Sequence, residues 1–179
     1  MNLMPYTENC LKRFLLLFKF VPFFIYIMWA SQTMSQTKPI VAFETTMGGF
    51  SVQLEPKKAP ETVKNFLKYA REGLYDGTIF HRVINKFMIQ GGGFDTDMKE
   101  RETFDPILNE ADIALANKRG TISMARTSDP HSATSQFFIN VVYNKFLDHT
   151  DKSSQGWGYT AFGRVIDGNG LPIDGKGPI

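Results

Sequence analysis

An arginine, a phenylalanine and a glutamine close together in the sequence could jointly recognise a peptide. They are Arg82, Phe87 and Gln90. Apolar and polar side chains alternate on both sides of Asn85-Lys86, which predicts two short half-buried strands that meet at a turn. The turn would bring the three side chains together. A guanidinium beside an aromatic wall and a carboxamide suits a ligand with an apolar ring and peptide carbonyls, and it does not suit a metal ion or a phosphate.

Several long blocks of sequence share the order and spacing of one known family. The blocks are residues 80–94, 122–127, 130–140, 146–149 and 155–159. They resemble the cyclophilin family of peptidyl-prolyl cis-trans isomerases, most closely its bacterial cytoplasmic members, and the resemblance runs from about Ile40 to Gly168. Blocks of this length are far more specific than a short glycine pattern. The resemblance implies an isomerase that acts on proline-containing polypeptides without a cofactor and assists protein folding.

Rotation about the peptide bond before proline is the reaction that the resemblance implies, and its barrier is roughly 18–20 kcal/mol. A donor aimed at the prolyl nitrogen lowers this barrier because the nitrogen lone pair localises only in the twisted transition state. Arg82 is the candidate donor, since a guanidinium keeps its protons at physiological pH whereas an imidazole does not. Gln90 is assigned to catalysis with it, through a hydrogen bond to a substrate carbonyl.

The matching family positions imply the rest of the substrate site. Four side chains are expected to form the pocket for the proline ring, although Phe138 and Leu147 taken alone would more often belong to a core. Gln136 is expected to support the network around Arg82, and the backbone of Arg126 to pair with an extended peptide. The substrate-binding residues implied are Phe87, Met88, Ala125, Arg126, Thr127, Gln136, Phe138, Phe146, Leu147 and Tyr159, the ring pocket being Phe87, Met88, Phe138 and Leu147.

Two aromatic positions depart from the eukaryotic pattern of the family. Phe146 stands where cyclosporin-sensitive members have a tryptophan, and Tyr159 stands where they have a histidine. Both replacements are compatible with isomerase chemistry. They predict weak cyclosporin binding at most.

Histidines and glycines in this chain are given structural roles. The three histidines, at positions 81, 131 and 149, lie far apart without paired ligand spacing, so no metal site is predicted. Residues 91–93 are three successive glycines that follow a predicted strand, but neither a helix pattern nor a Lys-Ser/Thr pair comes after them. They therefore predict a tight backbone passage rather than a phosphate-binding loop.

Composition and charge place the chain among ordinary globular proteins. Hydrophobic residues make up 42% and charged residues 21% of it, which excludes a disordered or a membrane-embedded class. The net charge is +2, and residues 1–33 contribute this excess because their three basic side chains outnumber Glu8. The rest is balanced and gives no sign of nucleic-acid binding. Cys10 is the only cysteine, so a disulfide within the chain is excluded.

Residues 1–33 form a hydrophobic N-terminal extension with three open interpretations. Basic residues precede an apolar stretch that Lys19 interrupts, as in a secretory signal or a membrane anchor through residues 12–30, either of which would make the protein periplasmic or membrane-anchored. The unbroken apolar run is shorter than the ~20 residues of a spanning helix and contains Pro22. It is also bulky, and no clear small-x-small cleavage site follows it. We favour a start at Met34 and a cytoplasmic protein.

The chain becomes regular from about residue 39 onward. Alternation on both sides of Gly48-Gly49 predicts a β-hairpin, and the apolar spacing from Pro60 to Gly73 predicts one helix. Residues 95–105 are predicted to form a surface loop. Later strands are expected at 121–125, 135–142 and 160–165. The predicted class is mainly β, a closed antiparallel eight-stranded cyclophilin-like barrel with a capping helix.

The segment 169–179 departs from the family pattern. Relatives continue into a helix and a last strand that closes the barrel, whereas this segment is too rich in glycine and proline to form them. We therefore expect a barrel without its last strand and second helix, and an open edge on the first strand. The expected domains are 1–33, an extension; 38–168, the isomerase domain; and 169–179, an atypical tail.

Two functions of different classes remain open at this stage. The first is a monomeric peptidyl-prolyl isomerase. The second is a non-catalytic proline-peptide-binding or chaperone-like module, or an inactive truncated product. The set of Arg82, Phe87, Gln90 and Phe138 favours the first function, and the tail favours the second.

Overall fold

The computed structural model describes residues 38–167 and 170. The predicted extension 1–33 and the segment 171–179 lie outside the described residues, as do positions 168 and 169. Among the helices of the described part, none is long and apolar enough to cross a membrane.

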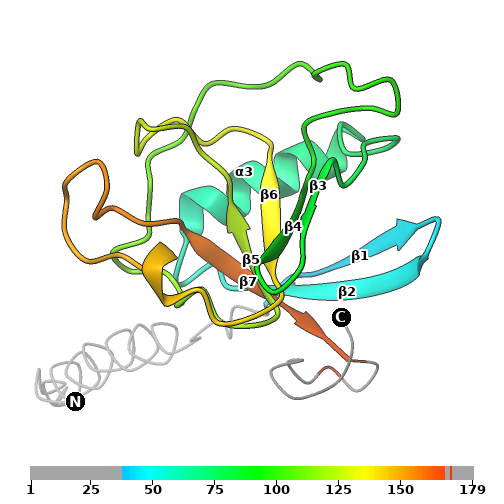
Figure 1. Cartoon of the computed structure of the whole chain (residues 1–179). Helices are drawn as coiled ribbons and strands as arrows, with labels where there is room; N and C mark the ends of the chain where they lie inside the picture. The colour runs from blue at the N-terminus through cyan, green and yellow to red at the C-terminus, as the bar shows by residue number, and fades with distance from the viewer. Residues whose placement is uncertain (1–37, 168–169, 171–179) are drawn as a thin grey trace, which may run out of the picture. The chain divides into compact units, whose positions relative to one another are not determined.

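One curled antiparallel sheet of seven strands dominates the described part (Figure 1). Its strand order is β1-β2-β7-β5-β6-β4-β3. The elements are β1 Ile40–Thr45, β2 Gly48–Leu54, α3 Pro60–Arg71, β3 Arg82–Ile84, β4 Met88–Gly91, β5 Thr121–Met124, β6 Phe137–Asn140, the 3₁₀ helix η1 Lys145–Leu147 and β7 Ala161–Ile166.

For residues 38–167, the mainly β class with one α-helix is confirmed, and so is the predicted hairpin of β1 and β2. Within residues 38–167, β1 and β3 each pair with a single strand, so a closed barrel of eight strands is not observed there. The predicted strand 135–142 is shorter in the structure, where β6 covers Phe137–Asn140. Beyond its two ends, the carbonyl of Gln136 accepts from the amide of Ala125, and the amide of Val141 donates to the carbonyl of Phe87. These two contacts attach the ends of β6 to neighbouring loops.

Helix α3 begins and ends at the predicted signals. Pro60 occupies the first turn, where a missing amide proton has no cost, and the carboxylate of Glu110 accepts hydrogen bonds from the amides of Glu61 and Thr62 at 3.1 and 2.9 Å. Gly73, just beyond the helix, has a φ of +68°, which favours glycine. Figure 1 shows α3 lying across the sheet.

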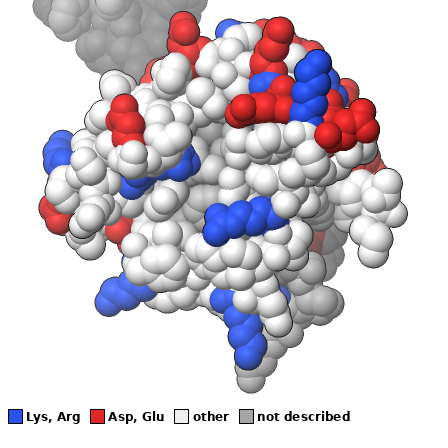
Figure 2. Space-filling view, turned by 45° about the horizontal axis from the view of Figure 1, so that its top comes forward, with Lys and Arg blue, Asp and Glu red and all other residues white. Residues whose placement is uncertain are grey.

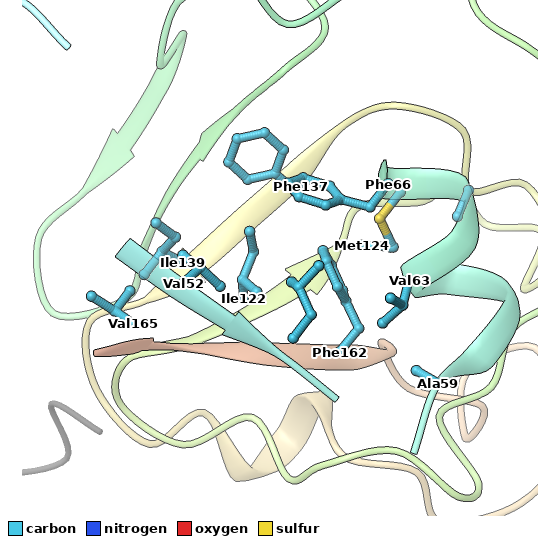
Figure 3. Packing of buried hydrophobic residues seen from close by; sticks show 12 residues of the cluster. Val52, Ala59, Val63, Phe66, Ile122, Met124, Phe137, Ile139, Phe162 and Val165 are labelled. Atoms are coloured by element: carbon cyan, nitrogen blue, oxygen red, sulfur yellow. The ribbon is translucent and has the colours of Figure 1, made fainter. Parts of the chain in front are cut away.

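The main core lies between α3 and the sheet (Figure 3). Val63 and Phe66 of the helix pack there against Phe162 of β7, with the rings of Phe66 and Phe162 5.1 Å apart. Phe137 of β6 belongs to this core, and its neighbour Phe138 belongs to a second, smaller cluster. Successive residues of a strand point to opposite faces, so β6 connects the core to a second apolar site.

The run of three glycines is a tight backbone passage, as predicted. A Cβ at Gly92 would lie 2.7 Å from the ring of Phe137, and the φ of Gly92 is +82°. A Cβ at Gly93 would collide with the side chain of Gln136. The passage therefore lets Gln136 approach the end of β4.

Candidate active site

The hairpin of β3 and β4 positions the two residues predicted to be catalytic. Arg82 and Gln90 are paired across the hairpin, and Lys86 in its turn has a φ of +57°. Nη1 of Arg82 donates to Oε1 of Gln90 at 3.4 Å, and Nε2 of Gln90 donates to Oε1 of Gln136 at 2.9 Å. A chain of polar contacts thus fixes the carboxamide of Gln90 beside the guanidinium.

A pocket of about 160 Å³ with both apolar and polar lining residues opens beside this chain. Its buried members are Met88, Phe138 and Leu147, and the ring of Tyr159 meets the ring of Phe138 edge-on at 5.7 Å. The pocket has room for one small apolar side chain. Its lining residues are Arg82, Phe87, Met88, Gln90, Ala125, Arg126, Phe138, Leu147 and Tyr159.

All nine lining residues were predicted to belong to the site, and the other three predicted residues lie outside the lining. Gln136 accepts a hydrogen bond from Gln90 and so helps to fix its carboxamide. Phe146 is 73% exposed and stacks on Phe87 with ring centroids 5.7 Å apart. Thr127 is exposed, and its hydroxyl donates to Oγ of Ser132 at 2.8 Å. Their roles in binding and catalysis stay predictions.

His81 lies directly before Arg82 and remains neutral near pH 7. Burial lowers its pKa, a hydrogen bond with the backbone of Ile79 opposes this, and the charge of Arg82 lowers it further. Its ring meets Phe94 edge-on at 4.7 Å. His81 therefore adds no second positive charge beside Arg82. Within residues 38–167, no group of three or more potential metal-ligating side chains comes together.

A buried asparagine that sequence reasoning missed holds two pocket residues in place. Nδ2 of Asn117 lies 3.1 Å from the carbonyl oxygens of both Leu147 and Tyr159, and it donates to them. Oδ1 of Asn117 accepts from Ser123 at 2.7 Å and from Asn140 at 3.3 Å. The signal in the sequence is weak: β5 contains polar Ser123 between Ile122 and Met124, and polar Asn140 ends the otherwise apolar β6.

We expect Asn117→Ala to lower the free energy of unfolding by at least about 3 kcal/mol, because several buried groups would lose their partners at about 1–3 kcal/mol each. Affinity for a proline peptide should fall as well, since Leu147 and Tyr159 would lose their anchor. Denaturant unfolding and peptide titration measure the two effects. Asn65→Ala is the control, because Asn65 makes one bond, to the Thr134 carbonyl at 2.7 Å, and does not line the pocket. Unchanged peptide affinity in a folded Asn117→Ala protein would contradict this role.

The fold and the site together define a mainly β domain that offers an apolar pocket and hydrogen-bond donors to a peptide. The family model described as "Cyclophilin type peptidyl-prolyl cis-trans isomerase/CLD" matches residues 40–171, which is most of the chain. The chain therefore belongs to the cyclophilin-type peptidyl-prolyl cis-trans isomerase family, and the predicted resemblance is confirmed.

Similar proteins agree with this assignment. The chain is 60% identical to peptidyl-prolyl cis-trans isomerase B of Escherichia coli (strain K12), over 72% of this chain and 79% of that protein. The crystal structure of cyclophilin AquaCyp293 from Hirschia baltica matches with a TM-score of 0.60 and 26% identity, over 79% of this chain and 71% of that one. A Cryptosporidium parvum cyclophilin type isomerase, solved in the presence of the dipeptide Ala-Pro, matches with a TM-score of 0.55 and 30% identity, over 76% and 92%.

Proposed function

We propose that this protein is a peptidyl-prolyl cis-trans isomerase that accelerates rotation about X-Pro bonds in flexible or unfolded polypeptides. Membership of the family supports the activity. We assign the activity to this site because the guanidinium of Arg82 lies at the edge of the pocket, beside the fixed carboxamide of Gln90. The pocket holds the proline ring, so the peptide bond before proline lies next to the donors.

Each donor has a separate task in the proposed mechanism. Arg82 donates to the prolyl nitrogen as the bond twists, which stabilises the transition state more than the planar ground state. An amide NH₂ has two protons, and Gln90 gives one to Gln136. Its second proton is available for a substrate carbonyl. No covalent bond breaks, so the reaction needs no cofactor.

A cis–trans exchange assay on a short Ala-Pro peptide tests the proposal. We expect the chain to accelerate exchange over the rate in protein-free buffer and the Arg82→Ala variant to accelerate it far less. Acceleration by the unmodified protein that falls sharply in the variant supports the isomerase. Peptide binding without acceleration would instead favour a non-catalytic peptide-binding or chaperone-like module.

We also propose a cytoplasmic monomer that assists protein folding and does not bind nucleic acid, with its isomerase domain at residues 38–168. The resemblance to bacterial cytoplasmic members and the balanced charge after residue 33 support this. Light scattering on the purified chain tests the oligomeric state, and refolding of a proline-limited client protein tests the role in folding.

We expect weak cyclosporin binding, and tighter binding after Phe146→Trp. Phe146 is largely exposed beside Phe87 at the pocket, so a larger ring with an indole N–H would add contact area and a donor there. Isothermal titration of both proteins measures the difference. Tyr143→Trp is the matched control, since Tyr143 is 50% exposed and does not line the pocket. Tight binding by the unmodified protein would contradict the expectation.

A further inference from the structure

The guanidinium of Arg126 is held in place entirely by neutral partners. Its Nε donates to the carbonyl of Gly158 at 2.9 Å, its Nη1 to the carbonyl of Thr127 at 2.9 Å, and its Nη2 to the carbonyl of Ser154 at 3.3 Å. The group also lies over the ring of Tyr159, 4.6 Å from its centroid. Backbone carbonyls orient a charge but do not cancel it. Arg126 is therefore a fixed cation whose full charge remains available to a ligand.

The pocket has no carboxylate of its own to balance this charge. Its lining contains Arg82 and Arg126 and no acidic residue. The ion pairs among the described residues join other side chains and include neither arginine. Asp148 follows a lining residue without lining the pocket itself, and its carboxylate is held in place by the backbone amide of Asn117 at 2.6 Å and the hydroxyl of Tyr143 at 3.0 Å. The carboxylate of Asp129 accepts from the amide of His131.

The distribution of charge on the surface agrees with a pocket lined by basic rather than acidic side chains. Figure 2 shows a hollow near the middle of one face, with blue side chains beside it and the largest gathering of red side chains toward the upper right. Clefts lined by one sign of charge attract ligands of the opposite sign.

The order of strands places the two arginines at opposite sides of the pocket. Arg82 is on β3 and Arg126 follows β5, and the strands β4 and β6 lie between them. Neighbouring strands are about 4.8 Å apart, so three spacings separate β3 from β5 by about 14 Å. A proline seated midway between them lies about 7 Å from Arg126, which is about two residues of an extended peptide at about 3.3 Å per residue. Arg82 is next to the peptide bond that rotates, whereas Arg126 can meet a flanking side chain.

We propose that Arg126 determines substrate specificity, by binding an acidic side chain about two residues from the isomerised proline. The preferred substrate class is an acidic proline-containing segment. This inference rests on the proposed isomerase function. The attraction is that of a partly exposed ion pair with one member already oriented, so we expect a gain of about 2- to 5-fold in kcat/KM.

Matched peptides test the proposal. Proline peptides carrying Glu or Gln two residues before or two residues after the proline are compared by exchange NMR, at low salt and at about 0.5 M NaCl. We expect the Glu peptide of one series to be isomerised faster, and this ratio to fall toward one at high salt. Arg126→Lys should keep most of the Glu/Gln ratio, Arg126→Gln should abolish it, and Lys57→Gln, at an exposed position outside the pocket, should leave it unchanged.

Failure of this inference and failure of the proposed function give different results. If neither peptide is accelerated, the isomerase proposal is wrong. If both are accelerated equally, or if the Glu preference survives in Arg126→Gln, the specificity proposal is wrong and the isomerase proposal stands. Should Arg126→Gln not fold, because loop 154–158 loses its anchor, the salt dependence of the Glu/Gln ratio in the unmodified protein and in Arg126→Lys decides the question.

Discussion

Arg82→Ala is expected to lower kcat by about 10²–10³-fold, which is the usual cost of removing one donor that acts mainly in a transition state. Peptide affinity should change far less, because the planar ground state offers the guanidinium no localised lone pair. Arg82 is exposed on β3 with only a 3.4 Å contact to Gln90, so the protein should stay folded. Exchange NMR measures the rate, and titration measures the affinity.

Two further variants separate the chemistry of Arg82 from its charge. Arg82→Lys should restore little activity, because an ammonium is a point charge without the planar fork. Arg71→Ala, at the exposed end of α3, removes an arginine outside the pocket and should leave the rate unchanged. Equal losses of rate and affinity in Arg82→Ala would mean that Arg82 holds the ground state only.

Phe138→Ala is expected to lower the free energy of unfolding by about 3–5 kcal/mol and to abolish most peptide affinity. Phe138 is 4% exposed and packs against Met88, Leu147 and Tyr159, so its removal leaves a cavity where the proline ring should bind. A domain's stability is only about 5–15 kcal/mol, so peptide titration should be done at low temperature on protein shown to be folded. Phe138→Leu provides a milder version of the same change.

The neighbouring residue gives a matched control for this prediction. Phe137 is 3% exposed on the same strand but packs in the main core against Phe66 and Tyr75. Phe137→Leu should destabilise the protein about as much as Phe138→Leu while leaving peptide affinity nearly intact. If the two variants lose affinity equally, global destabilisation rather than the pocket explains the loss.

Much of the fold followed from local sequence signals. The alternation around Gly48, the proline at the start of α3 and the glycine beyond its end each act within a few residues, so they predict the hairpin and the helix from the sequence alone. Arg82 and Gln90 are likewise brought together by a local turn. Residues farther apart, such as Phe138 and Tyr159, could be assigned to the same site only through the family resemblance.

The tertiary structure decided what depends on contacts between distant segments. Local alternation shows that Phe137 and Phe138 point to opposite faces of the sheet. It does not show which face meets the core and which meets the pocket, because that depends on how β6 packs between α3 and its neighbouring strands. The role of Asn117 arises because residues 117, 147 and 159 converge around one buried side chain. The tertiary structure also shows that the partners of Arg126 are neutral backbone carbonyls. Every residue has a carbonyl, so no sequence pattern indicates which carbonyls a side chain will contact.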